Sequence, residues 1–317
     1  MVKIGYRTIK TAIGTPIAIW IAQLMSLENF ASAGILTILC IQVTRKRSIL
    51  SAWHRFAACI VAMVFSFLFF ETLGYNPISI GLMLFLFIPT TVKLKISPGI
   101  VTSSVIILHL YGSKGIDAGV VTNELLLIVV GIGTALLLNL YMPSMDKKLY
   151  EYQEKIEHNF TVILKELATY LREGDNDWSG TELTETADLL EESKTMAFRD
   201  VENHLLRSHN QHYHYFNMRL KQFELLERML PLVSRISGPY KHAVKIAEFF
   251  EELADAVHPG NTAIIYLRQI QTLRKEFRED NLPESREEFE VRASLFNLLN
   301  EIEQYLIIKR SFKKSDV

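Results

Sequence analysis

The stretch FAACIVAMVFSFLFFETL, residues 56–73, decides the fold, because it is eighteen residues long and apolar on every face. A helix needs about twenty such residues to cross the hydrocarbon core of a bilayer, whereas the surface helix of a soluble domain keeps one polar face. The bilayer core offers no water to backbone groups, and an α-helix satisfies them internally. The stretch therefore predicts a transmembrane helix, with Glu71 as its one charged residue.

Five further apolar runs flank this helix within the first 143 residues. The runs at 77–92 and 99–112 are short for full spans, and Pro89 and Pro98 interrupt the region. A broken or re-entrant pair is therefore an alternative to two crossings there. Both readings leave an even number of crossings, and about six transmembrane helices are expected. The five runs cover about residues 11–27, 28–44, 77–92, 99–112 and 118–142.

Lysine and arginine are distributed unevenly around these runs. Eleven of them lie before the first run, after the sixth, or in the loops that join runs two and three and runs four and five. Only Lys114 lies in the other three loops. Because basic residues in short loops stay on the cytoplasmic side, both termini are expected in the cytoplasm of a multi-pass protein of the cell (plasma) membrane. The eleven are Lys3, Arg7, Lys10, Arg45, Lys46, Arg47, Arg55, Lys93, Lys95, Lys147 and Lys148.

The composition changes at about residue 143. Residues 1–143 carry ten basic and four acidic side chains, a net charge of +6; by difference from the chain's 34 basic and 35 acidic residues, residues 144–317 carry −7. Beyond Ser144, apolar residues recur at steps of three and four, which predicts amphipathic helices. The predicted fold class is all-α, with a transmembrane domain at 1–143 and a cytoplasmic helical domain at 144–317.

The second domain is predicted to be a helical bundle whose first helix continues directly from the sixth span. Its breaks are expected at GDNDWSG (174–180), Ser237-Gly238-Pro239 and His258-Pro259-Gly260. Ser285, with Glu288 three residues later, is a capping-box pattern that starts the last helix. The helices are expected at about 149–174, 181–231 (continuous or kinked), 240–257, 262–279 and from 285 onward.

Three ionisable residues inside the predicted spans are candidates for proton coupling: Glu71, His109 and Glu124. In the predicted orientation all three fall near the outer face, at one depth. Ionisable groups in spans are costly and are functional hypotheses by default, and carboxyl and imidazole groups in a low-dielectric site can exchange protons during transport. The alternative is that the two glutamates lie in the headgroup region in contact with water.

A basic cluster at the predicted cytoplasmic mouth is the candidate site for substrate binding. Arg55 starts the third span, and Arg45 belongs to the basic loop before it. A guanidinium binds a carboxylate through two parallel hydrogen bonds, which suits a small organic anion; the alternative is that these residues only set the topology. Ser103, on the fifth span, is a third candidate, and its alternative role is hydrogen bonding between helices.

Other kinds of site lack support in the sequence. No strongly basic domain indicates nucleic-acid binding, and no phosphate loop, dinucleotide turn or catalytic signature appears. Cys40 and Cys59 lie in apolar runs, where a thiol behaves as a small hydrophobe. We expect neither an enzyme nor a metal or cofactor. The second domain's histidines lack metal-binding spacing and fit a solvated, aromatic-rich helix face better; they are His204, His209, His212 and His214.

Residues 4–63, IGYRTIKTAIGTPIAIWIAQLMSLENFASAGILTILCIQVTRKRSILSAWHRFAACIVAM, resemble the membrane domain of the aromatic acid exporter family, which is related to fusaric acid resistance transporters. The matching features are a first span that begins Thr-Ala, a Gln-x-Thr near basic residues, and the Ser51-x-x-x-Arg55 pattern. The phrases AFRDVENHLLR, QFELLERMLPLV and HPGNTA resemble the C-terminal domain of Bacillus-type members. The resemblance covers nearly the whole chain.

The resemblance implies proton-coupled or gradient-driven export of aromatic carboxylic acids. Many relatives carry glycines directly after the arginine, where this chain has Ala57, Ala58 and Ala62. Relatives with assigned efflux roles commonly have twice the membrane region, so a homodimer would rebuild a two-half transporter. The alternative function is a membrane-anchored sensor or scaffold whose cytoplasmic helical domain binds a partner.

Overall fold

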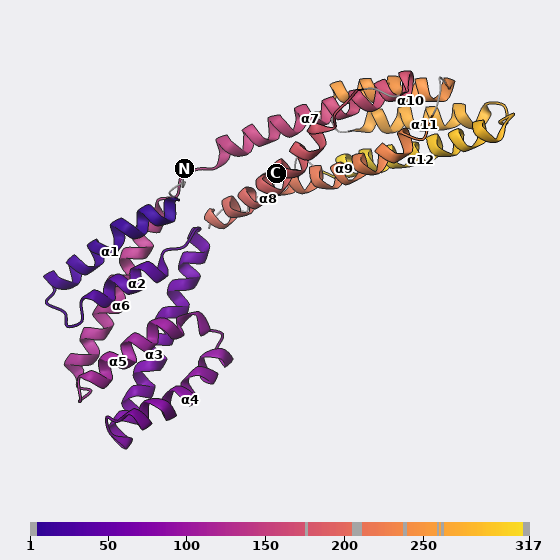
Figure 1. Cartoon of the computed structure of the whole chain (residues 1–317). Coiled ribbons are helices and arrows are strands. Elements are labelled where there is room, and N and C mark those ends of the chain that lie inside the picture. The colour runs from indigo at the N-terminus through magenta and orange to yellow at the C-terminus, as the bar shows by residue number, and fades with distance from the viewer. Residues whose placement is uncertain are drawn as a thin grey trace. The chain divides into compact units, whose positions relative to one another are not determined.

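The structure, a computed structural model, describes residues 5–174, 177–204, 211–236, 240–258, 260 and 263–312. Every regular element in these ranges is a helix (Figure 1), so the predicted all-α class is confirmed for them. The chain forms two compact units: residues 1–143 with 202–206, and residues 144–201 with 207–317. His209 and the predicted break at 237–239 lie outside the described residues.

The helices of the first unit coincide with the six apolar runs. Of the helices in the described residues, only α3 and α6 are long and apolar enough to cross a membrane by themselves. Helix α2 has ten residues, or about 15 Å, half the thickness of the hydrocarbon core. Six full crossings therefore stay a prediction. The helices are α1 (Tyr6–Leu24), α2 (Ala31–Cys40), α3 (Arg45–Leu73), α4 (Pro77–Lys93), the short 3₁₀ turn η1 (Ser97–Gly99), α5 (Ile100–Gly112) and α6 (Ala118–Leu140).

The outer surface of the first unit carries many large apolar side chains. Trp20, Trp53, Phe85 and Leu137 are all exposed. Soluble proteins rarely expose extended apolar patches, whereas lipid tails are a favourable environment for them. Together with the apolar lengths of α3 and α6, this surface indicates a membrane protein.

Helix α3 starts eleven residues earlier than the predicted span. The sequence indicated a basic loop before residue 56, but α3 begins at Arg45, and Thr44 caps it by accepting a hydrogen bond from the Arg47 backbone N–H. Residues 45–55 contain neither glycine nor proline, so nothing stops the helix from extending toward the cap. Arg45 and Arg55 are thus ten residues apart on one helix, about 15 Å along its axis.

Gly99 brings the start of α5 very close to α3. A Cβ atom at Gly99 would lie 2.4 Å from the Ala58 Cβ atom and 2.6 Å from the carbonyl oxygen of His54. Only a residue without a side chain allows this approach. The contact fixes the first turn of α5 beside Arg55.

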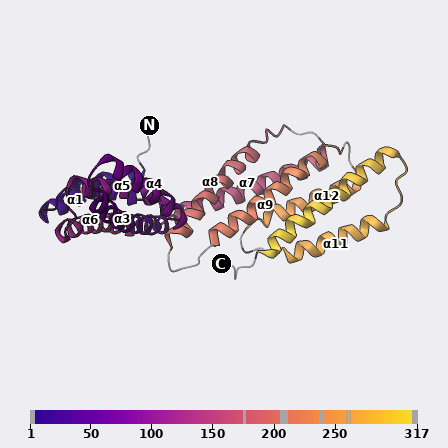
Figure 2. The same cartoon turned by 90° about the horizontal axis from the view of Figure 1, so that it is seen from below.

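The second unit is a bundle of helices around one hydrophobic core. Helix α7 packs along α10, and α9 packs along α12, which also contacts α11; Figure 2 shows α9, α12 and α11 side by side. The core includes Phe160, Phe216 and Phe250. The helices are α7 (Asp146–Glu173), α8 (Thr181–Asn203), α9 (Gln211–Val233), α10 (Lys241–Asp255), α11 (Ile264–Glu279) and α12 (Arg286–Ser311). The last two residues of α8, Glu202 and Asn203, belong to the first unit.

Three predicted helix boundaries are corrected by this bundle. Residues 141–145, which include Pro143, are not helical, so α7 does not continue directly from α6. The region predicted at 181–231 forms two helices, α8 and α9, and α9 continues through Pro231 to Val233. The predicted cap of the last helix is confirmed, because Ser285 Oγ accepts a hydrogen bond from the Glu288 N–H at 3.1 Å.

Candidate functional site

Arg55 is buried at the contact between α3 and α5, and two hydroxyl groups hold its side chain. Its Nε atom donates to Ser51 Oγ at 3.2 Å, and its Nη1 atom donates to Thr102 Oγ1 at 2.5 Å. The residue is 9% exposed. No described residue forms an ion pair with it. A guanidinium has five N–H donors, so Arg55 keeps donors and an uncompensated charge for a further acceptor.

The other two predicted substrate residues are placed differently. Arg45 lies at the start of α3, where its backbone N–H donates to the side chain of Asn203, another residue of the first unit, at 3.1 Å. Ser103 is fully buried, and its hydroxyl donates to the carbonyl oxygens of Gly99 and Ile100, each at 3.0 Å. Its neighbour Thr102, rather than Ser103, contacts Arg55. The structure therefore brings neither Arg45 nor Ser103 to Arg55.

His109 and Glu124 meet in a buried cluster that also contains Ser32. The His109 Nδ1 atom lies 3.0 Å from Glu124 Oε2, and its Nε2 atom lies 3.0 Å from Ser32 Oγ. Glu124 is 1% exposed, which excludes the alternative that it lies in contact with water. The cluster joins α2, α5 and α6. Sequence reasoning missed Ser32, because a lone serine in an apolar run gives no signal until the histidine is placed beside it.

Glu71 lies apart from this cluster. It is exposed, and one of its oxygens accepts hydrogen bonds from the Tyr75 hydroxyl at 2.7 Å and from the Ile116 backbone N–H at 3.3 Å. These bonds tie the end of α3 to the segment before α6. Of the three residues predicted to meet at one depth, the structure therefore brings together His109 and Glu124, while Glu71 has the surface position of the alternative interpretation.

Helix α5 links the arginine to the histidine. Thr102 and His109 are seven residues apart on it, which corresponds to about 10 Å along the helix axis. A shift of α5 would therefore displace both His109 and Thr102, the hydrogen-bond partner of Arg55. This connection through α5 could not be seen from the individual residues and is the main result of the fold for the site.

The order Ser32, His109, Glu124 is also that of a serine hydrolase triad. A nucleophilic serine must be open to its substrate, but Ser32 is 5% exposed. The hydrogen bonds place the imidazole between the Ser32 hydroxyl and the Glu124 carboxylate.

Lys10 is a buried cation that the sequence placed in a flanking segment. Its Nζ atom donates to the carbonyl oxygen of Tyr141 at 2.6 Å and contacts Asn139 Oδ1 at 3.4 Å, and it is 7% exposed. A positive charge at the C-terminal end of α6 is favoured by the helix dipole. Lys10 is thus explained by its own partners and ties α1 to α6.

Three histidines of the second unit, His212, His214 and His242, pack against aromatic rings. His212 lies between Tyr150 and Phe216, with ring centroids 5.0 and 6.3 Å away. Within the ranges that the structure describes, no group of three or more His, Cys, Asp or Glu residues could hold a metal ion. Cys40 and Cys59 are buried free thiols.

Comparison with known proteins links both units to one family. Residues 2–142 match the model described as "Aromatic acid exporter family member 1", and residues 146–310 match the "Putative aromatic acid exporter C-terminal domain". The chain is 60% identical over 313 residues to "Uncharacterized protein YqjA" of Bacillus subtilis (strain 168), covering 99% of this chain and 97% of that protein.

Two further relatives match part of the chain. "UPF0421 protein YgaE" of the same organism is 29% identical over 175 residues, which cover 54% of this chain and 47% of that protein. A crystal structure of a "putative membrane protein from Clostridium difficile 630" has a TM-score of 0.45 at 23% identity and covers 51% of this chain and 97% of that one. Because the two family models together cover almost the whole sequence, the chain belongs to the aromatic acid exporter family.

Proposed function

We propose that this protein is a secondary exporter that moves aromatic carboxylic acids, or similar amphipathic organic anions, across the plasma membrane. The observation that carries the proposal is Arg55, a buried guanidinium whose hydrogen-bond partners in the described residues are two neutral hydroxyls. A buried charge without an opposite charge is costly. A substrate carboxylate would supply the missing charge through two parallel hydrogen bonds.

Proton coupling is assigned to the cluster of Ser32, His109 and Glu124. A neutral imidazole donates from Nδ1 to the carboxylate and accepts from the serine hydroxyl; when protonated, it donates from both nitrogens. Protonation would thus change the bond to Ser32, and so the contact between α5 and α2. Because α5 also carries Thr102, this change would reach the partner of Arg55.

The membrane arrangement forms part of the proposal. We propose six crossings with both termini in the cytoplasm, since the basic residues favour that orientation. One chain provides a single set of six helices, so a homodimer would provide the two halves of a transporter. The second unit would then hold the dimer together or gate its cytoplasmic mouth.

The direct test is transport by the purified protein in liposomes. Labelled benzoate and hydroxybenzoates are loaded, and their efflux is measured with and without an imposed pH gradient, for the wild type and for Arg55→Gln. We expect gradient-dependent efflux that the substitution reduces at least tenfold. Lys114→Gln, which changes an exposed basic residue of the same unit, is the matched control. Equal efflux by the wild type and Arg55→Gln would remove Arg55 from the mechanism.

A membrane-anchored sensor is the second candidate, and one observation favours it. The cluster of Ser32, His109 and Glu124 is internally satisfied, as in a structural contact. A sensor would bind a ligand without moving it across the membrane. Absence of efflux for every acid tested, in liposomes that contain correctly oriented dimers, would favour the sensor.

A further inference from the structure

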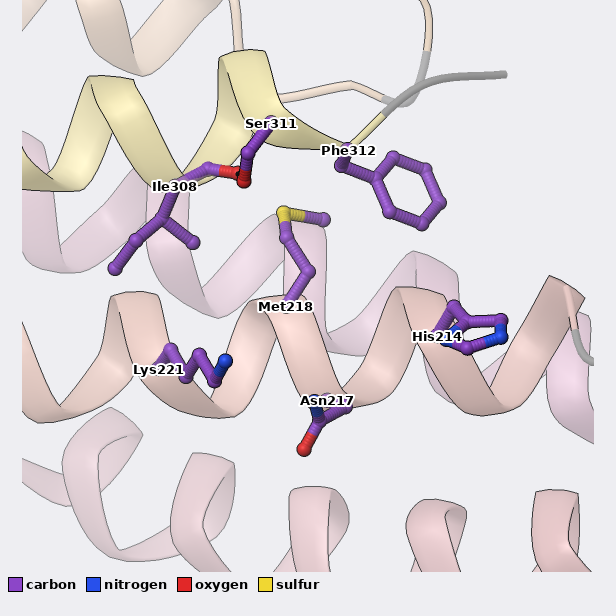
Figure 3. A pocket seen from close by; sticks show the side chains of 7 residues that line it. All are labelled: His214, Asn217, Met218, Lys221, Ile308, Ser311 and Phe312. Atoms are coloured by element: carbon purple, nitrogen blue, oxygen red, sulfur yellow. Dashed lines mark hydrogen bonds between the residues drawn. The ribbon is translucent and has the colours of Figure 1, made fainter. Parts of the chain in front are cut away.

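A groove in the second unit lies between α9 and α12, near the end of α12. Figure 3 shows that α9 supplies its polar side and α12, with the residue after it, supplies the facing side. The groove has a volume of about 470 Å³, within the range of sites for small molecules. Its lining residues are His214, Asn217, Met218, Lys221, Ile308, Ser311 and Phe312.

The spacing of the α9 residues explains why they share the groove. His214, Asn217 and Lys221 follow one another at steps of three and four, so they project from one face of the helix. Met218 lies beside them and is 5% exposed. The helix thus presents an imidazole, an amide and an ammonium group next to a buried thioether.

The opposite side of the groove is apolar and aromatic. Ile308 and Ser311 lie three residues apart on α12, and the Phe312 ring follows the last turn. That ring packs edge-on against Tyr215, with 6.1 Å between their centroids. A planar apolar ligand would lie against Phe312 and the sulfur of Met218, a favourable contact for an aromatic ring.

The charges around the groove favour an anion. Lys221 is exposed and has no hydrogen bond or ion pair with any described residue, and none of the lining residues is acidic. A carboxylate near Lys221 would find an unoccupied ammonium donor and, at Asn217, an amide donor.

We propose that this groove is a binding site for a small aromatic carboxylate, separate from Arg55. The ring lies between Phe312 and Met218, and the carboxylate binds Lys221 and Asn217. The inference goes beyond the proposed export, because it gives the second unit a ligand of its own and makes it the part of the chain that senses such acids. The inference holds whether the first unit transports a substrate or only anchors the chain in the membrane.

Binding of 4-fluorobenzoate to the full-length protein in mild detergent tests the proposal by ¹⁹F NMR titration. The variant Lys221→Glu reverses the charge at the groove, and Lys155→Glu makes the same change at another exposed lysine of the second unit. We expect Lys221→Glu to weaken binding at least tenfold and Lys155→Glu to leave it within twofold. The neutral analogue 4-fluorobenzamide should bind at least tenfold more weakly than the acid.

Two further variants separate this site from the membrane unit and guard against misfolding. Asn217→Ala should weaken binding severalfold with an unchanged helical circular dichroism spectrum, and Arg55→Gln should leave the component that depends on Lys221 unaltered. Binding that is lost in Arg55→Gln but kept in Lys221→Glu would overturn the proposal and assign the acid to the first unit. Equal affinity for the acid and the amide would overturn it as well.

Discussion

Among the residues that the structure describes, each unit buries one arginine, and the two differ in what surrounds the charge. Arg219 on α9 is 1% exposed and contacts Glu157 Oε1 at 3.4 Å, Tyr215 Oη at 2.9 Å and Gln222 Oε1 at 3.1 Å. Its guanidinium carbon also lies 5.2 Å from the centroid of the Phe160 ring. Arg55 also lies on a long helix, but within the described ranges its side chain bonds only to the hydroxyls of Ser51 and Thr102.

This difference distinguishes Arg219, whose charge has a structural role, from Arg55, whose charge is available to a ligand. The positive charge of Arg219 is compensated within its own unit by Glu157, and its donors are used by neighbours that pack around it. The charge of Arg55 has no such partner among the described residues. A buried arginine is thus a poor indicator of function by itself, and the presence or absence of a carboxylate beside it decides between the two roles.

The largest expected effect comes from breaking the compensated pair. Glu157→Ala leaves Arg219 buried without an acid and should lower the free energy of unfolding of the second unit by about 3–5 kcal/mol. Urea unfolding of the full-length protein measures this through Trp178 fluorescence, after Trp20 and Trp53 are replaced by phenylalanine.

Glu151 provides the matched control for that substitution, because it is an exposed glutamate on the same helix. Glu151→Ala should change the free energy of unfolding by less than about 0.5 kcal/mol. Similar losses for the two variants would mean that Glu157 does not compensate Arg219, and the contrast with Arg55 would disappear.

Removing the uncompensated Arg55 should lower efflux and leave stability nearly unchanged. Arg55→Met takes away a buried charge that has no acid, so the first unit should keep its thermal stability, while efflux of hydroxybenzoates falls at least tenfold, or about 1.4 kcal/mol. Scanning fluorimetry and liposome efflux measure the two quantities. A large loss of stability with an unchanged rate of efflux per folded molecule would place Arg55 with Arg219 as a structural charge.

Lys309 sharpens the comparison, because it is a second cation near Arg219. Burial, together with repulsion from Arg219, lowers the pKa of Lys309 from its usual value to about 7. Above that pH the folded protein has released a proton that the unfolded chain still holds, so stability should rise between pH 7 and 9, by at most about 1.4 kcal/mol per pH unit. Lys309→Met should abolish this rise, and urea unfolding at pH 7, 8 and 9 tests it. A wild type with stability independent of pH over this range would contradict the prediction.

The smallest expected effect concerns the hydroxyl partner of Arg55. Thr102→Val keeps the shape of the side chain and removes one hydrogen bond, while Arg55 keeps its charge and its bond to Ser51. We expect a less than tenfold rise in the KM for efflux, with the maximal rate nearly unchanged. The control is Thr122→Val, an exposed position on α6 whose hydroxyl bonds only to its own helix. An effect as large as that of Arg55→Met would indicate that Thr102 itself contacts the substrate.

The sequence predicted the helices well, because apolar spacing is a local signal. It indicated all six helices of the first unit and the cap at Ser285, but it placed the start of α3 at residue 56, since a run of positive charges resembles a loop. Arginines and lysines form helices readily when a cap such as Thr44 precedes them. That property is visible only in the folded backbone.

Candidate site residues could be predicted from the sequence where an ionisable residue lay inside an apolar run. His109, Glu124 and Arg55 stood out among apolar neighbours, and the structure buries Glu124 and Arg55 and leaves His109 half-buried. Ser32 did not stand out, because serine is common in membrane helices. Arg219 escaped notice for a different reason: it lies in a segment of mixed polar and apolar residues, and which face of α9 points inward depends on helices far along the chain.

The close approach at Gly99 has a mechanical consequence. Because a Cβ atom at Gly99 would lie 2.4 Å from the Ala58 Cβ atom and 2.6 Å from the His54 carbonyl oxygen, a larger residue there would push the start of α5 away from α3. That displacement would reach Thr102, the hydrogen-bond partner of Arg55, in the first turn of α5, and His109 near the other end of the same helix.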